Sequence, residues 1–442
     1  MKRWVLLVAA LPAFLPAWAT AGQDEFLSAR PKIQQQLRSK KVDDRLVAVR
    51  RLEDFHHVEA AKLLLQTQTD DISPDVREAA FQALIVAFSD ADVRRQILQN
   101  IKRFLAAKDP VEAQAVLASV LAADLKEGEP EVLAFVDKTV GGERGGVLTV
   151  ILLADGLGVH GQLCDFKALE RLTRTALFVQ HFGVRRAVVD ALVRIRRPES
   201  LGVQIKLLSQ IDGEIQAELA GHLTAITGQQ FALDALAWSK WWEANRETFV
   251  IPPAGPIVGA PVPAAIGSSS SYYGMPVYAK RIVFVFDTSS SMNGERLEAA
   301  KRELVQAIGN LPETTLFTVV IFSTGVNAWQ KQLVPATDKA RQSAISYVSG
   351  QAALGNTNTF GALEAAFGFD AEAIYFLTDG EPSIGKVVAP PEIVNLITRM
   401  NRGRRETIHT IGIGVGPPGN LFDVFLSALA QQNYGQYRRV DN

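Results

Sequence analysis

The sequence predicts a helical N-terminal region followed by an α/β doubly wound, Rossmann-like domain. Amphipathic segments of helical period recur up to residue 250, whereas from residue 280 onward short β-branched and aromatic runs alternate with helical patterns. Between them, residues 251–279 are rich in Pro, Ala, Gly and Ser, a composition typical of a linker, although Tyr272, Tyr273 and Tyr278 could dock part of it. We therefore predict a signal segment at 1–21, a helical domain at 22–250, a linker at 251–279 and an α/β domain at 280–442.

The predicted helical domain repeats one pattern. Residues 75–88 place apolar side chains at helical spacing, and residues 183–192 repeat the arrangement. Related segments begin near Asp44, Val111, Leu148 and Ile215, at intervals of about 31 to 37 residues, a period typical of helical solenoids. The motif Asp-Val-Arg-x-Ala-Ala-x-x-Ala-Leu resembles HEAT-type repeats, so we predict a HEAT-like solenoid.

Two side-chain groups within the helical domain have competing interpretations. Trp238, Trp241 and Trp242 share one helical face and predict a packed cap on the array rather than a ligand platform. A group of arginines forms either a basic strip for an acidic partner or a solvated helix face beside Asp190 and Glu199. Its members are Arg185, Arg186, Arg194, Arg196 and Arg197.

The α/β domain contains six predicted strands and their connecting helices. The strands are expected at 281–286, 317–322, 328–334, 374–378, 407–413 and 436–440, with 328–334 as a half-exposed edge strand. Helices are expected at about 297–308, 337–348, 391–400 and 421–431. Strand, polar loop and helix in succession is the beginning of a parallel sheet, in which ligands bind beyond the carboxyl ends of the strands.

Three loops at those carboxyl ends carry oxygen-bearing side chains. Asp287, Ser289 and Ser291 follow the first strand at alternate positions, Thr357 precedes a helix, and Asp379 ends a later strand. Carboxylate and hydroxyl oxygens are the ligands that hard divalent cations prefer. The sequence therefore predicts a metal site on one rim of the sheet, although an isolated Asp-x-Ser-x-Ser is often only a helix-capping loop.

The three motifs together resemble the metal-ion-dependent adhesion site of von Willebrand factor type A domains, and the resemblance covers roughly residues 280–442. It implies that Ser289 and Ser291 bind the ion directly and that Thr357 is a switchable ligand, direct in a high-affinity state. Asp287 and Asp379 would bind directly or through ordered water. Mg²⁺ suits this set, with Mn²⁺ and Ca²⁺ as alternatives. In this family the sixth position is commonly filled by a Glu or Asp of a partner protein.

A glycine pattern at residues 412–416 competes as a dinucleotide motif. Pro417 and Pro418 remove backbone N–H donors where a pyrophosphate would need them, so we do not expect nucleotide binding. The whole chain has 46 Lys and Arg against 47 Asp and Glu, a net charge of −1. This balance gives no electrostatic footprint for nucleic acid.

The amino terminus predicts export. Lys2 and Arg3 precede an apolar stretch from Trp4 to Leu15, and the small-x-small sequences Ala17-Trp-Ala19 and Ala19-Thr-Ala21 offer cleavage sites. We expect a periplasmic or extracellular protein with no stable membrane span after cleavage; an uncleaved N-terminal anchor is the alternative. The single cysteine, Cys164, excludes an intramolecular disulfide.

Taken together, these features predict an exported, non-enzymatic interaction or adhesion protein. Its α/β domain would grip an acidic side chain of a protein partner through the cation, and its repeats would act as a scaffold or second surface. One alternative is a metal-dependent hydrolase, for which Glu381 and the more distant Lys386 are the available groups in the site loops. The other is a passive scaffold without metal.

Overall fold

A computed structural model describes residues 23–55, 57–71, 73–87, 90, 93, 146–160, 163–252 and 270–441. The chain divides into two compact units, Met1–Glu131 and Val132–Asn442. The predicted signal segment, the repeat near Val111 and most of the predicted linker lie outside the described residues. Within the described ranges, no helix is long and apolar enough to cross a membrane.

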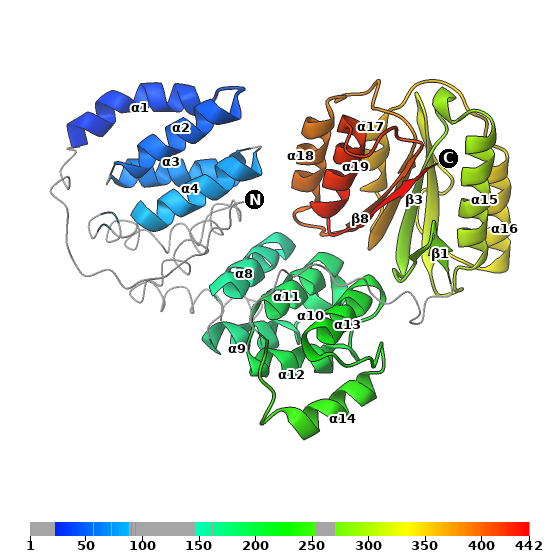
Figure 1. Cartoon of the computed structure of the whole chain (residues 1–442), viewed down its shortest axis with the longest axis horizontal. Helices are drawn as coiled ribbons and strands as arrows, with labels where there is room; N and C mark the ends of the chain where they lie inside the picture. Colours follow the sequence, from blue (N-terminus) through cyan, green and yellow to red (C-terminus); the bar gives the residue numbers. More distant parts are fainter. Residues whose placement is uncertain are drawn as a thin grey trace. The chain divides into compact units, whose positions relative to one another are not determined.

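The first unit contains a run of packed helices (Figure 1). They are α1 (Gln23–Leu37), α2 (Val42–Glu53), α3 (Val58–Asp70) and α4 (Pro74–Ala87). The α4 helix confirms the helix predicted at 75–88. Its face with Val76, Ala80 and Leu84 is fully buried, as the helical spacing of these residues predicts. The HEAT-like solenoid itself stays a prediction.

The second unit begins with a further group of helices. They are α8 (Val147–His160), α9 (Leu163–Leu172), α10 (Ala176–Gln180), α11 (Phe182–Arg194), α12 (Pro198–Leu207), α13 (Gly213–Thr227) and α14 (Ala235–Asn245). In α14, Trp238 is fully buried and its indole N–H donates to the carbonyl of Ala232 at 2.9 Å. Trp241 and Trp242 on the same helix remain half-buried.

The α/β domain is built on a seven-stranded sheet in the order β5-β4-β3-β7-β8-β9, with β6 also paired to β4. The strands are β3 (Arg281–Asp287), β4 (Leu316–Phe322), β5 (Val326–Ala328), β6 (Val334–Pro335), β7 (Ala373–Thr378), β8 (Thr407–Ile413) and β9 (Tyr437–Val440). β4, β3, β7, β8 and β9 run parallel, whereas β5 and β6 are antiparallel to β4. The sheet is therefore mixed.

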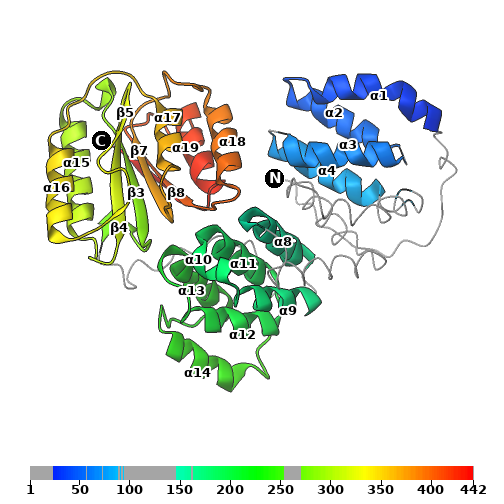
Figure 2. The same ribbon diagram turned by 180° about the vertical axis from the view of Figure 1, so that it is seen from behind.

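Helices cover both faces of this sheet (Figures 1 and 2). The short helix η1 (Ser290–Met292) follows β3, and the others are α15 (Glu295–Gly309), α16 (Asp338–Ser349), α17 (Thr359–Ala366), α18 (Pro390–Asn401) and α19 (Leu421–Gln431). Alternate residues of β3 serve the two faces: Phe284 and Phe286 pack in the core under α15 and α16, and Val283 and Val285 in the core under α17 to α19. β3 is buried on both sides, as its continuous apolar run predicts.

The prediction of one continuous edge strand at 328–334 is wrong. The chain instead pairs with β4 twice, through β5 at Val320–Phe322 and through β6 at Leu316 and Phe317. Between these pairings Trp329 stacks on Phe317, with ring centroids 5.3 Å apart. The backbone N–H of Trp329 still donates to the Val319 carbonyl at 2.8 Å, so the segment stays along β4 between the two short strands.

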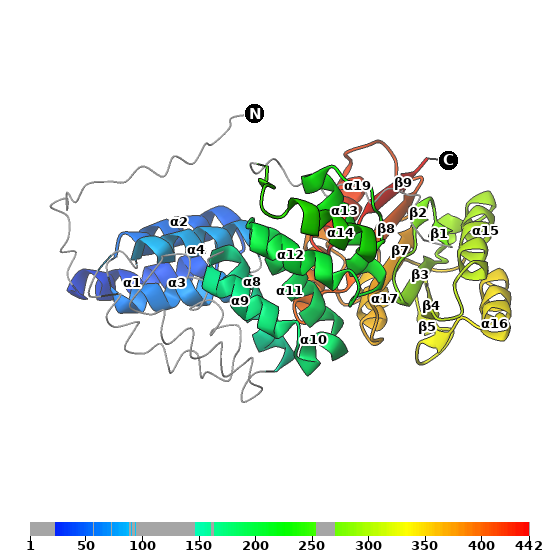
Figure 3. The same cartoon turned by 90° about the horizontal axis from the view of Figure 1, so that it is seen from below.

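Residues 270–279 belong to the α/β domain although their composition predicts a linker. They form the hairpin of β1 (Ser271–Tyr272) and β2 (Met275–Pro276), close to the start of β3 (Figure 3). Tyr272 is 1% exposed and its ring meets Phe284 edge-on at 5.5 Å. The hydroxyl of Ser270 donates to the Ala307 carbonyl at 2.8 Å. Tyr272 thus docks this part of the predicted linker on the α/β domain.

Buried ion pairs join the helices of the second unit to the beginnings of the sheet strands. Arg186 of α11 is 1% exposed; it contacts both carboxylate oxygens of Glu218, at 2.6 and 3.1 Å, and donates to Thr407 Oγ1 at 2.6 Å. Arg405, just before β8, pairs with Asp155 of α8. Neither predicted arrangement of the arginine group holds for Arg186, because it is covered by the neighbouring domain.

Candidate functional site

Asp287 lies at the carboxyl end of the central strand β3, next to the end of β7. Asp287 is fully buried, and within the described ranges no Lys or Arg forms an ion pair with its carboxylate. Oδ1 accepts from the backbone N–H of Ser289 at 2.7 Å, and Oδ2 accepts from Thr378 Oγ1 at 2.5 Å. Burial raises the pKa of Asp287 to about 6, although the hydrogen bonds from Thr378 and Ser289 oppose this rise.

Ser289 and Ser291 flank the beginning of η1 and place two hydroxyls beside each other. Their Oγ atoms lie 3.0 Å apart. Ser289 is 1% exposed, whereas Ser291 is exposed. Ser291 Oγ donates to Asp379 Oδ1 at 2.7 Å and so joins the first loop to the loop after β7. The group therefore has a buried side at Asp287 and an open side at Ser291.

Thr357 enters the same group from the loop before α17. Backbone hydrogen bonds fix this loop against the first one: Ser290 N donates to Gly355 O at 3.0 Å, and Leu354 N to Thr288 O at 2.8 Å. Thr357 N donates to Ser383 Oγ at 2.9 Å, which ties it to the loop after β7. The threonine is 5% exposed.

Gly380 shows how closely the loops converge. A Cβ atom added there would lie 3.2 Å from Ser291 Oγ and 3.5 Å from Thr357 Oγ1. Both hydroxyls thus face the same glycine, which directly follows Asp379. The structure therefore brings all of the predicted residues into one cluster. These are Asp287, Ser289, Ser291, Thr357 and Asp379.

Residues 280–439 match the family model of the von Willebrand factor type A domain. The C-terminal domain is a von Willebrand factor type A domain. The matched residues include the three loops that carry Asp287, Thr357 and Asp379.

Curated relatives match the same region. The chain is 31% identical over 183 residues to human inter-alpha-trypsin inhibitor heavy chain H4, and 30% identical over 180 residues to bovine heavy chain H3. Each match covers 38% of this chain, and 19% and 20% of the respective relative. The chain thus spans about a fifth of the length of these relatives.

Among solved structures, the chain is similar to a von Willebrand factor type A protein from Catenulispora acidiphila. The two are 22% identical, the match covers 40% of each chain, and the TM-score is 0.33. An aerotolerance-related membrane protein from Bacteroides fragilis matches at 18% identity over 37% of this chain and 92% of its own, with a TM-score of 0.29.

Two side chains of this von Willebrand factor type A domain join the site without having been predicted. Thr378 donates to Asp287, and Arg296 Nη1 lies 2.5 Å from Asp379 Oδ2 and 3.2 Å from the Ser291 carbonyl oxygen. Thr378 could have been noticed because it precedes Asp379 at the end of a strand. Arg296 stands in the first turn of α15, where a cation opposes the helix dipole, and this unfavourable position was the available signal.

The donor set fits a hard divalent cation. It contains two carboxylates and three hydroxyls, all of them oxygen ligands of the kind that Mg²⁺ accepts while keeping several waters. Because residue 380 is glycine, no Cβ atom lies beside the hydroxyls of Ser291 and Thr357 at this position. The cluster has the chemistry for such an ion, with Arg296 as an additional cation at its edge.

Other titratable groups of the domain lie apart from this chemistry. Glu381 is exposed, and Lys386 Nζ contacts the two carboxylate oxygens of Glu364 at 2.9 and 2.8 Å. His409 lies within β8, where its Nδ1 accepts from Gln436 N at 3.2 Å and its ring stacks on Tyr375. Its Nε2 lies 3.3 Å from Glu214 Oε1, so it belongs to the contact with the helices.

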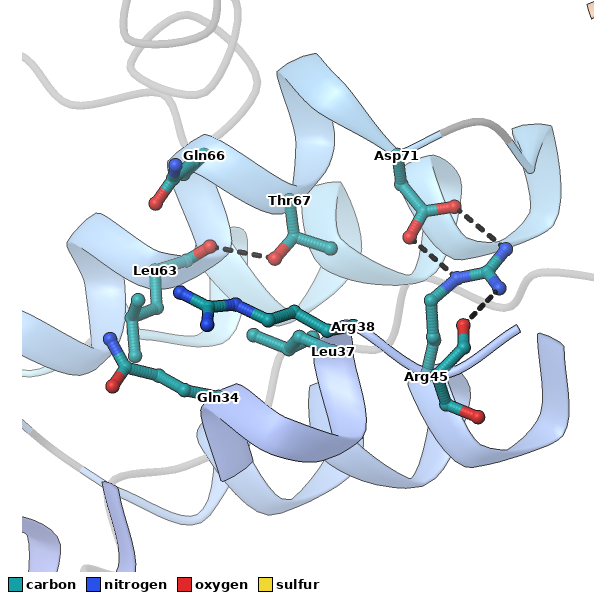
Figure 4. Close-up of a pocket in the computed structure, with 9 residues that line it drawn as sticks. Gln34, Leu37, Arg38, Arg45, Leu63, Gln66, Thr67 and Asp71 are labelled. Atoms are coloured by element: carbon teal, nitrogen blue, oxygen red, sulfur yellow. Dashed lines mark hydrogen bonds and ion pairs between the residues drawn. The ribbon is translucent and has the colours of Figure 1, made fainter. Parts of the chain in front are cut away.

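A hollow of about 370 Å³ lies among α1, α2 and α3 of the first unit (Figure 4). Its lining includes the ion pair of Arg45 and Asp71, with Nε and Nη2 of the arginine 2.8 and 3.1 Å from the two carboxylate oxygens. Arg45 also donates to the Ser39 carbonyl at 2.9 Å. Both carboxylate oxygens already have partners, so this pair ties α2 to the end of α3 rather than presenting a free charge.

Proposed function

We propose that this is an exported, non-enzymatic interaction or adhesion protein whose von Willebrand factor type A domain grips an acidic residue of a protein partner through Mg²⁺. Asp287, Ser289, Ser291, Thr357 and Asp379 would hold the ion. The single observation that carries the proposal is the convergence of these oxygens from three loops at the carboxyl ends of β3 and β7.

The exposed side of the cluster supports a role in binding a partner. Asp287 and Ser289 lie at its buried side, whereas Ser291 is exposed. An ion held there would be reached by a large ligand only from the Ser291 side. Because three of the five proposed ligands are neutral hydroxyls, the ion would keep much of its positive charge and favour a carboxylate from a Glu or Asp of the partner.

The groups around the cluster favour binding over catalysis. Hydrolysis at a metal site ordinarily needs a positioned base within hydrogen-bond reach of the reacting water. Glu381 points to solvent, and Lys386 is held by Glu364. Asp287 is occupied by two hydrogen bonds at its buried position. These arrangements suit ligation and structural support.

Export and the scaffold role of the helices complete the proposal. Support for export comes from the basic and then apolar N-terminal segment with its small-residue cleavage sites. Support for a scaffold comes from the buried pairs by which α8 and α11 hold the strand beginnings, at the opposite edge of the sheet from the oxygen cluster. The cluster is thereby left uncovered by these helices.

Capture of partners from the native extracellular fraction tests this proposal. The purified chain is immobilised with Mg²⁺ and eluted with EDTA, and Ser289→Ala is compared with Ser290→Ala. Ser290 is an exposed neighbour outside the proposed ligand set, so it is a matched control. We expect specific proteins in the EDTA eluate of the wild type and of Ser290→Ala, and their loss from Ser289→Ala. Retention of the same proteins in EDTA and by Ser289→Ala would refute the proposal.

A further inference from the structure

Arg296 places a fixed positive charge on a carboxylate of the proposed metal site. Its Nη1 lies 2.5 Å from Asp379 Oδ2, and the Asp379 side chain is 0% exposed. The same nitrogen is 3.2 Å from the Ser291 carbonyl oxygen, so the guanidinium bridges two of the loops that supply the ligands. Arg296 is 27% exposed in its side chain and therefore lies at the edge of the cluster.

The position of Arg296 in its helix is unfavourable for a positive charge. It is the second residue of α15, where backbone N–H groups and the helix dipole favour negative charge. The other charged residues of that turn, Glu295 and Glu298, follow this preference. The contact with Asp379 offsets the unfavourable interaction of Arg296 with the helix dipole. It gives a buried carboxylate a partner, without which that carboxylate would be strongly unfavourable.

We propose that Arg296 is a built-in counter-cation of this site, which neutralises Asp379 in the metal-free protein and thereby weakens the binding of the divalent ion. This inference rests on the proposed function, since it needs the cluster to bind metal. Oδ1 of Asp379 faces the Ser291 hydroxyl, while Oδ2 faces Arg296. The incoming ion therefore meets a carboxylate whose charge is already compensated, together with a nearby like charge.

Loss of the guanidinium has opposite effects on the two states of the protein. Without metal, Asp379 is left buried without its counter-cation, so the folded protein is less stable. With metal, the ion itself supplies the missing charge, and the repulsion from Arg296 is gone. The thermal stability lost by the substitution is therefore regained when metal binds.

Calorimetric titration of the full-length chain with Mn²⁺ tests the inference in four proteins. Arg296→Gln removes the charge, and Arg296→Lys keeps it. Arg302→Gln is the matched control: Arg302 lies on the same helix, is 65% exposed and pairs with Glu295 at 2.6 Å. We expect Arg296→Gln to bind Mn²⁺ about tenfold more tightly, which corresponds to about 1.4 kcal/mol. Arg296→Lys and Arg302→Gln should bind as the wild type does.

The outcomes separate this inference from the proposed function. If the wild type binds Mn²⁺ and Arg296→Gln binds it equally or more weakly, the counter-cation role is refuted and the metal site stands. If the wild type binds no Mn²⁺, both fail. Melting temperatures give a second readout: Arg296→Gln should melt below the wild type in EDTA, with the difference reduced by Mn²⁺. Should Arg296→Gln not fold, a tenfold change of affinity in Arg296→Lys would contradict charge as the cause.

Discussion

The hydroxyl of Thr378 donates a 2.5 Å hydrogen bond to Oδ2 of Asp287, across 91 residues of sequence. The bond joins the ends of the adjacent parallel strands β3 and β7. Since Ser289 N occupies the other carboxylate oxygen, Asp287 is held in one orientation at the buried side of the cluster. The hydrogen bond from Ser289 N to this carboxylate holds Ser289 in place, and the Ser291 hydroxyl lies 3.0 Å from that of Ser289.

Removal of the Thr378 hydroxyl should weaken both the fold and the proposed ion site. Thr378→Val keeps the shape but leaves a buried carboxylate oxygen without its donor, which should lower the free energy of unfolding by about 1.5 to 3 kcal/mol. Thr318→Val on β4 is the control, because that hydroxyl is also buried but its closest hydrogen-bond contacts are 3.3 and 3.4 Å long. Urea unfolding compares them; equal losses would contradict a special role for Thr378.

A side chain at position 380 should block the cluster without unfolding the domain. In Gly380→Ala the new methyl group would crowd the hydroxyls of Ser291 and Thr357, at 3.2 and 3.5 Å. We expect Mn²⁺ affinity to fall at least about tenfold, a loss of about 1.4 kcal/mol, with an unchanged circular dichroism spectrum. Gly309→Ala, where the added Cβ has nothing within 4 Å, should bind Mn²⁺ normally. An unaltered affinity in Gly380→Ala would show that the ion does not bind between these loops.

Arg186, which pairs with Glu218 of α13 and donates to Thr407 of β8, should couple the helices to the sheet. Arg186→Ala removes the partner of both Glu218 and Thr407, and we expect destabilisation of about 2 to 4 kcal/mol, reduced by the 35% exposure of the Glu218 side chain. Arg194→Ala on the same helix is the control. Its side chain is 44% exposed and lies 3.5 Å from Asp155, so its loss should stay within about 1 kcal/mol.

Tryptophan fluorescence during urea unfolding provides the readout for the Arg186 and Arg194 variants. Trp238, Trp241 and Trp242 all lie on α14 and report on the helices. The transition of Arg186→Ala should occur at clearly lower urea than those of the wild type and Arg194→Ala. Coincident transitions for all three proteins would mean that Arg186 does not contribute to this contact.

Glu406 should make stability depend on pH. Burial raises its pKa to about 8 in the folded protein, from an ordinary value of 4.5. The folded state therefore holds this proton more tightly than the unfolded state does. The resulting stabilisation is complete below about pH 4.5 and is lost as the pH rises towards 8.

Glu406→Gln isolates this pH dependence because the amide stays neutral. Between about pH 5 and pH 8 the variant should lose less stability than the wild type. Glu392→Gln, at an exposed position, serves as the control and should follow the wild-type profile. Parallel profiles for wild type and Glu406→Gln would exclude Glu406 as the group responsible.

Much of the α/β domain followed from the sequence because its parallel strands are continuous apolar runs. The strand that ends at Asp287 and the following helix up to Gly309 were predicted with nearly the observed bounds. Convergence of the loops after β3 and β7 followed as well, since parallel strands end at the same edge. The loop of Thr357 connects α16 to α17, so this rule does not place it. These predictions need only local periodicity and the direction of the chain.

The unpredicted features depend on which side chains meet across long separations. Arg296 and Asp379 are 83 residues apart, and nothing in the local pattern states that they touch. Arg186 lies in an amphipathic helix, but periodicity does not reveal that Thr407 of another domain covers its polar side. The composition of residues 270–279 does not reveal that they form a hairpin, or that Tyr272 packs on Phe284.

Calorimetric titration of the purified chain with Mn²⁺ shows whether the oxygen cluster is a divalent-cation site. We predict one bound ion per chain, with binding abolished in Asp287→Ala and Ser289→Ala and preserved in Ser290→Ala. Absence of binding to the wild type, or undiminished binding to Asp287→Ala and Ser289→Ala, would contradict it.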